Sequence, residues 1–67
     1  MKANLGYITL TDKKTWAPVI LNISKITDIE GIENNGTKIT TSNRGEVYVR
    51  EAYGDIRAAV AEWRMEN

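Results

Sequence analysis

The side chains of this chain that could do chemistry are mainly its carboxylates. Asp28 and Glu30 lie two residues apart, so they would share one face of a strand, and Glu30 and Glu33 come just before an Asn-Gly turn. Such pairs can bind a hard cation or exchange protons with a substrate. Because surface carboxylates at this density are usually only solvated, we assign no catalytic and no metal-binding residue.

The residue types required for most nucleophilic catalysis are missing. The chain contains no histidine and no cysteine, so serine–histidine and cysteine–histidine nucleophiles cannot form. Disulfides and thiolate metal sites are excluded for the same reason. No cluster of glycines joins a strand to a helix, and a phosphate-binding loop is therefore absent. We expect a protein that is not an enzyme and uses no cofactor.

The charge pattern also limits the partners. Nine basic and nine acidic residues cancel, so the chain lacks the positive field of a nonspecific nucleic-acid binder and the basic helix of a membrane-surface protein. No apolar run approaches the roughly 18 residues of a membrane span, and the first residues show no signal-peptide pattern. We expect a cytoplasmic protein of bacterial or phage origin.

The length of the chain, 67 residues, predicts a single domain over residues 1–67 with a thin core. A chain of this size buries only about 60% of the surface that it exposes when unfolded. Small domains compensate with disulfides, metals or self-association. Of these sources of stability, self-association remains for this chain. We therefore expect a homo-oligomer, a dimer or higher.

Alternation of apolar and polar residues predicts the first two strands, over residues 5–11 and 15–21. Asp12, Lys13 and Lys14 begin the connection between them. Pro18 has no amide hydrogen, so the second strand should be an edge strand or carry a bulge. The residues expected to face inward are Ile8, Leu10, Ala17, Val19 and Leu21.

The middle of the chain is less regular. Asn22 should bond to nearby backbone in a turn over residues 22–25. A strand to Glu33 would follow, with Ile29 inward and a bulge at Gly31 that moves Ile32 to the other side. A short helix over this stretch is the alternative, although β-branched residues and Gly31 oppose it.

Two tight turns then separate the last predicted strands. Asn34-Asn35-Gly36 favours a type I′ hairpin turn before a strand over 37–41, in which Ile39 faces inward. A second turn over 43–45 precedes a strand over 46–50, with Val47 and Val49 inward and Tyr48 outward. The connections are local, so the strands should form a meander.

From about Glu51 the apolar period changes from two to 3.6, which predicts a C-terminal helix. Ile56, Val60 and Trp63 form its apolar stripe. The expected fold is therefore a β-rich α+β fold, in which one helix packs on a small antiparallel meander of about five strands, or on a sheet curled toward a barrel.

Several large side chains remain outside this core. Strand parity places Tyr7, Trp16, Ile20 and Tyr48 on the face opposite the helix, with cations nearby at Arg50, Arg44 and Lys38. They could be ordinary surface residues, or a curled sheet could bury both of its faces. An apolar patch rimmed by charge, with tyrosine, tryptophan and arginine, is typical of binding surfaces.

The chain from Val19 to Val60 resembles the small flagellar and swarming-motility proteins of the FlbD-like family. The matching positions are Leu10-Thr11, Val19-Ile20-Leu21-Asn22, Ile26, Ile29-Glu30, Ile39-Thr40-Thr41, Gly45, Val47-Tyr48-Val49, Glu51, Ile56 and Val60. The resemblance implies a small accessory protein and brings no catalytic residues. A weaker likeness, from Ile26 to Glu30 with the following hairpin and helix, is to the first half of LytTR-type DNA-binding domains, whose basic second half is missing.

Three functions stay open. The first is an interaction or accessory module, regulatory or from a phage or other mobile element, that self-associates and binds or sequesters a protein partner. The second is a nucleic-acid-binding module that uses Tyr48, Arg44, Arg50 and Lys38 as a stacking and phosphate platform. The third is a small-molecule (nucleotide) sponge with a pocket at an oligomer interface.

Overall fold

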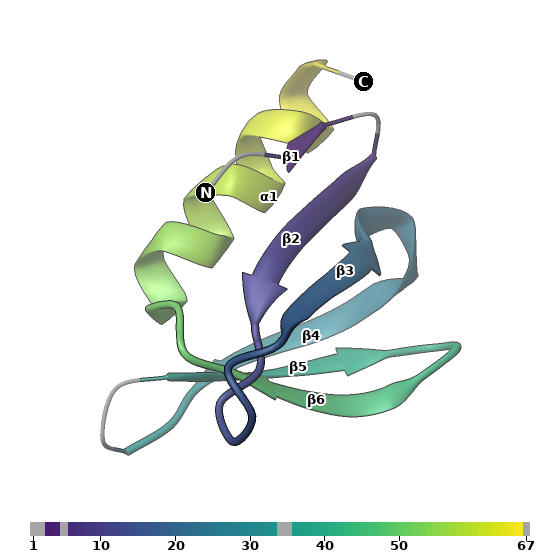
Figure 1. Cartoon of the computed structure of the whole chain (residues 1–67). Coiled ribbons are helices and arrows are strands. Elements are labelled where there is room, and N and C mark those ends of the chain that lie inside the picture. Colours follow the sequence, from purple (N-terminus) through teal and green to yellow (C-terminus); the bar gives the residue numbers. More distant parts are fainter. Residues whose placement is uncertain (1–2, 5, 34–35, 67) are drawn as a thin grey trace.

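The computed structural model describes residues 3–4, 6–33 and 36–66. The chain folds into two antiparallel sheets and one C-terminal helix (Figure 1). The expected α+β, β-rich class is confirmed. The strands form two sheets of three, however, rather than one continuous meander.

Sheet A contains β1 (Ala3–Asn4), β2 (Tyr7–Thr11) and β3 (Pro18–Asn22), in that spatial order. Ile8 lies opposite Leu21, and Leu10 opposite Val19. These four side chains are buried, as alternation predicts for the inward face of a strand pair. β3 is an edge strand, which confirms the prediction from Pro18. It begins at Pro18 itself, so Ala17 is exposed in the loop rather than inward.

A short 3₁₀ helix, η1 (Ile23–Lys25), separates the two sheets. The Oδ1 atom of Asn22 accepts a hydrogen bond from the Ser24 amide at 3.0 Å, which is the local bond expected for this turn. Ile23 is fully buried, and its amide donates to the Gly6 carbonyl at 2.8 Å. This anchored turn redirects the chain, so that β4 begins a second sheet instead of extending the first.

Sheet B contains β4 (Ile26–Gly31), β5 (Thr37–Thr41) and β6 (Gly45–Val49). β4 ends before the predicted limit at Glu33. The pairing of β4 with β5 shifts register between Ile26 and Asp28, whereas Gly31 pairs regularly with Thr37. The predicted bulge at Gly31 is therefore wrong. The predicted type I′ turn falls on Asn34 and Asn35, which lie outside the described residues.

The two sheets approach each other at one corner. The Lys13 amide donates to the Tyr48 carbonyl at 3.0 Å, and the Arg50 amide donates to the Thr11 carbonyl at 2.9 Å. Across the described part of the chain, no strand pairing joins β3 to β6 or β3 to β4. The sheets therefore do not close into a barrel.

Helix α1 (Tyr53–Glu66) lies against β1 and β4 on one side of the two sheets (Figure 1). Ile56 and Val60 are buried, and Trp63 and Ala59 pack partly buried against the core, as the stripe predicts. The helix starts at Tyr53 rather than near Glu51. Among the described residues, no helix has the length and apolarity needed to cross a bilayer.

One hydrophobic core joins both sheets and the helix. β5 buries the side chains of Thr37, Ile39 and Thr41 on its inner face. The Thr37 hydroxyl is satisfied there because it donates to the Glu51 carbonyl at 2.8 Å. The buried apolar residues are Ile8, Leu10, Val19, Leu21, Ile23, Ile26, Ile39, Val49, Ile56 and Val60.

Candidate functional site

The outer face of sheet A carries exposed apolar side chains. Tyr7 is 50% exposed and Ile20 is 59% exposed. Ile20 pairs with Thr9, so Tyr7 is its diagonal neighbour across β2 and β3. Pro18 is also exposed on this face, opposite Thr11. Tyr7 and Ile20 are thus together on one surface, and we call Tyr7, Pro18 and Ile20 the sheet A patch.

Trp16 is in the loop between β2 and β3, so strand parity does not apply to it. Its φ angle is 65°, in the left-handed region that bulky residues rarely adopt. The loop is fixed by Asp12, whose Oδ1 atom accepts hydrogen bonds from the amides of Lys14 at 2.8 Å and Thr15 at 2.9 Å. These bonds, first of all the one from Thr15, lower the pKa of Asp12. The turn therefore holds Trp16 out in solvent, where 67% of it is exposed.

Arg50 lies beneath Trp16. Its guanidinium carbon is 3.5 Å from the centre of the indole ring, a close cation–π contact. The Nε atom of Arg50 is buried and has no hydrogen-bond partner. The stacked ring shields the cation, and the pair lies at the end of β6.

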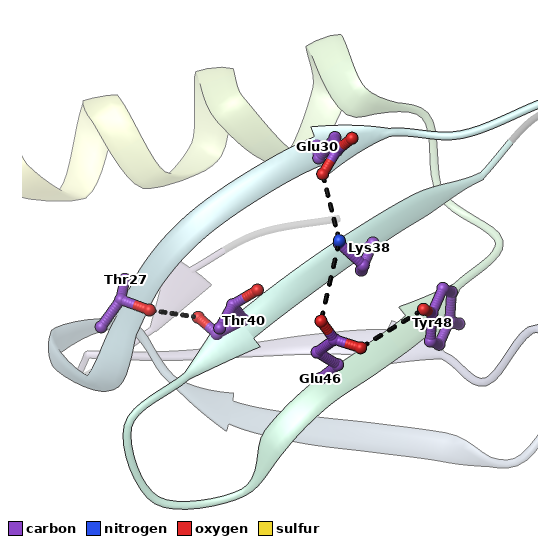
Figure 2. A network of polar contacts seen from close by, with 6 residues as sticks. All are labelled: Thr27, Glu30, Lys38, Thr40, Glu46 and Tyr48. Atoms are coloured by element: carbon purple, nitrogen blue, oxygen red, sulfur yellow. Dashed lines mark hydrogen bonds and ion pairs between the residues drawn. The ribbon is translucent and has the colours of Figure 1, made fainter.

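Tyr48 and Lys38 lie on the outer face of sheet B, where they are paired neighbours on β6 and β5. Figure 2 shows the Lys38 amine between Glu30, at 3.2 Å, and Glu46, at 3.7 Å. The hydrogen bond and charge of Glu30, followed by the charge of Glu46, raise the pKa of Lys38. The Tyr48 hydroxyl donates to Glu46 at 3.5 Å. This face is a polar network.

The four aromatic and apolar residues therefore do not form one face. The inner faces of the sheets meet in the core, so their outer faces point away from each other. Tyr48 lies on sheet B, and Tyr7 and Ile20 lie on sheet A, which corrects the expectation of a single patch. Parity along one meander cannot anticipate this, because η1 divides the strands into two sheets.

Arg44 extends from the β5–β6 turn to β3. Its Nη1 atom donates to the Ile20 carbonyl at 3.2 Å. Of the predicted cations, Arg44 therefore contacts the edge of sheet A, Arg50 stacks on Trp16, and Lys38 pairs with carboxylates. They do not converge on one platform.

Sequence reasoning missed a cavity of about 710 Å³ between β3, the β2–β3 loop and the β5–β6 hairpin. Lys13, Lys14 and Val47 line it, together with the predicted residues Arg44 and Tyr48. The edge position that Pro18 indicates was the one available signal, because an edge strand leaves space beside it. A second hollow of about 490 Å³ lies between α1 and β4.

The carboxylates bring no metal site together in the described residues, where no group of three potential acidic ligands is found. The Glu30 carboxylate forms an ion pair with the Lys38 amine instead. Comparison of the chain with protein-family models, with curated proteins and with solved structures finds no match. The resemblances to the FlbD-like family and to LytTR-type domains stay predictions.

Proposed function

We propose that the chain is a non-enzymatic interaction module that self-associates and binds or sequesters a protein partner. The observation that carries this proposal is the exposure of Tyr7 and Ile20, which are diagonal neighbours on the outer face of sheet A. Contiguous exposed apolar residues on a small protein are typical of an interaction surface. Trp16, in the loop that leads into β3, adds a large, well-held aromatic of the kind enriched in binding hot spots.

The core supports the same proposal, because it is complete without these residues. Ile8, Leu10 and Leu21 on the inner face of sheet A are each at most 1% exposed. Neither Tyr7 nor Ile20 is needed to fill that core. Covering them with a second copy would remove more apolar surface from water, and a domain of this size gains much from such burial.

The test is the oligomeric state of an Ile20→Glu variant. A carboxylate in the centre of the sheet A patch would be buried without a partner in the interface, so we expect the variant to be monomeric where the wild-type chain associates. Light scattering after size exclusion, over a series of concentrations, measures this. Ala58→Glu, on the exposed surface of α1, is the matched control and should associate normally. A wild-type chain that is monomeric at every concentration would contradict self-association.

The nucleic-acid alternative receives less support from the geometry. It needs cations that converge near Tyr48. Lys38 is neutralised by Glu30 and Glu46, and Arg50 stacks on Trp16, so of the three predicted cations only Arg44 lines the cavity beside Tyr48. The charge of Lys38 is thus already compensated within the chain. A salt-sensitive mobility shift with single-stranded oligonucleotides would restore this alternative.

A further inference from the structure

The side of the molecule opposite α1 is open. The helix contacts β1 and β4, which are one edge of each sheet. The other two edges are β3 and β6, and the cavity of about 710 Å³ lies between them. No helix of the described chain covers this side, and Val47, on the inner face of sheet B, is only half-buried here.

The floor of the cavity is apolar. Val19 from β3 and Val47 from β6 line it, and both belong to the inner faces of their sheets. Val47 and Ile32, a further lining residue, are only half-buried. An apolar group placed in the cavity would complete the burial of these side chains.

The rim of the cavity is more basic than acidic. Lys13, Lys14 and Arg44 line it, together with the carboxylates of Asp12 and Glu46. Both carboxylates are already engaged: Asp12 accepts the amides of its own loop, and Glu46 pairs with Lys38. Lys14 and Arg44 are exposed, so their positive charges can attract an anion into the cavity.

The edges favour a compact ligand over an added strand. The Lys13 backbone amide already donates to the Tyr48 carbonyl of β6, and the Arg44 guanidinium already donates to the Ile20 carbonyl of β3. Pro18 has no amide hydrogen to offer to a further strand. Both edges therefore offer fewer free backbone groups to an extended peptide, whereas the volume is within the usual range of small-molecule sites.

We propose that this cavity binds a small apolar carboxylate, with its apolar part against Val19 and Val47 and its carboxylate toward Lys14 and Arg44. The site lies within a single chain, unlike the interface pocket considered from the sequence. It does not depend on the proposed self-association, which uses the outer face of sheet A. A negative result for ligand binding in the cavity therefore does not contradict self-association, and the reverse also holds.

The test compares two probes that differ in charge, 1-naphthoate and 1-naphthamide, by nitrogen-15 NMR titration of the full chain. We expect saturable shifts of the amides of Lys13, Lys14, Val19 and Val47. One ion pair at a partly exposed site is worth up to about 1 kcal/mol, so naphthoate should bind about fivefold more tightly than naphthamide.

Two variants locate the site. Val47→Phe should fill the cavity and abolish the shifts, and the double variant Lys14→Gln/Arg44→Gln should remove the preference for naphthoate. Lys25→Gln/Arg64→Gln, which removes the same number of charges outside the cavity, is the control and should bind like the wild-type chain. Thermal melts show whether each variant is folded. The double variant, at two exposed positions, tests the site if Val47→Phe does not fold.

Three results would overturn the proposal. The first is the absence of saturable shifts at millimolar probe concentration. The second is equal affinity for the two probes. The third is a set of shifts centred on Tyr7 and Ile20, which would mean that the aromatic ring only adheres to the sheet A patch.

Discussion

Gly6 and Gly45 both have positive φ angles, of 83° and 74°, but their surroundings differ. A Cβ atom on Gly6 would lie 3.3 Å from Cζ2 of Trp63, whereas one on Gly45 would meet nothing within 4 Å. Substitution of each by alanine therefore separates backbone strain from steric contact.

We expect Gly45→Ala to lower the free energy of unfolding by about 1 kcal/mol, because the left-handed conformation disfavours a Cβ atom. Gly6→Ala should cost about 1 kcal/mol more, since Trp63 must also move. Urea denaturation measures both. Gly54→Ala, in the helix and in open space, should raise the stability by about 1 kcal/mol instead. Equal losses at Gly6 and Gly45 would show that Trp63 does not restrain the glycine.

The pKa of Asp12 predicts the direction in which the stability of the folded chain changes with pH. Its pKa is below the ordinary value of 3.8 in the folded chain, because the amides of Thr15 and Lys14 stabilise the carboxylate. The contribution of this charge to stability is therefore present above pH 3.8 and is lost as the pH falls through the lowered pKa. Melting of the wild-type chain and of Asp12→Asn should differ near neutral pH and converge in acid. A pKa of Asp12 at or above 3.8, measured by NMR, would contradict this.

At the scale of single residues, the sequence predicted the bonds and burial of residues whose environment is set by near neighbours in the chain. Asn22 bonds the Ser24 amide, as a turn asparagine should, and Ile8 and Leu10 are buried as alternation requires. Strand parity placed Trp16 wrongly on a sheet face, because nothing in its residue type predicts the positive φ that it adopts in the loop. Its position follows from the bonds that Asp12 makes within the loop.

Among the elements, the segment between β6 and α1 adds side-chain hydrogen bonds that tie the two sheets together. The Glu51 carboxylate accepts hydrogen bonds from the amide and the hydroxyl of Thr11, both at 2.9 Å. The Glu51 carbonyl accepts the buried Thr37 hydroxyl. The change of period predicted a helix from about Glu51. In the structure Glu51 lies before the helix and bridges β2 to β5.

Glu51→Ala should therefore lower the free energy of unfolding by about 2 kcal/mol, because it leaves the Thr11 donors without a charged acceptor. Glu51→Gln retains an acceptor oxygen and should lose less. Chemical denaturation gives the values. Glu62→Ala, at an exposed position of α1, is the control and should change the stability by less than about 0.5 kcal/mol. A loss at Glu51 as small as that at Glu62 would show that the bridge adds little.

Across the whole molecule, the sequence predicted the fold class and the helix stripe but not the division into two sheets. Each hairpin depends on residues that are near one another in the chain, such as Ile39 and Val47, and periodicity detects these. The arrangement of sheet A against sheet B depends on η1 and on Glu51, whose bonds to Thr11 join residues 40 positions apart. Periodicity carries no information about such distant pairs. For the same reason Tyr48 was assigned to the wrong surface, whereas Tyr7 and Ile20 were correctly placed on one face.

The salt dependence of self-association should show which surface is used. The sheet A patch is apolar, so its association should be unchanged or strengthened when sodium chloride is raised toward molar concentration. An association through Lys38, Glu30 and Glu46 of sheet B would weaken, because salt screens exposed charges. Sedimentation velocity at low and high salt distinguishes the two. Dissociation at high salt would move the interface away from the sheet A patch.

The bond pattern between the sheets has a consequence for how the chain reaches its native state. The β2–β3 and β5–β6 hairpins each close over a few residues, so they can form quickly and separately. The bonds from Thr11 to Glu51 require the chain to close a loop of about forty residues, which is slower. If the two hairpins dock after the transition state, loss of the Glu51 carboxylate will accelerate unfolding and leave the refolding rate almost unchanged.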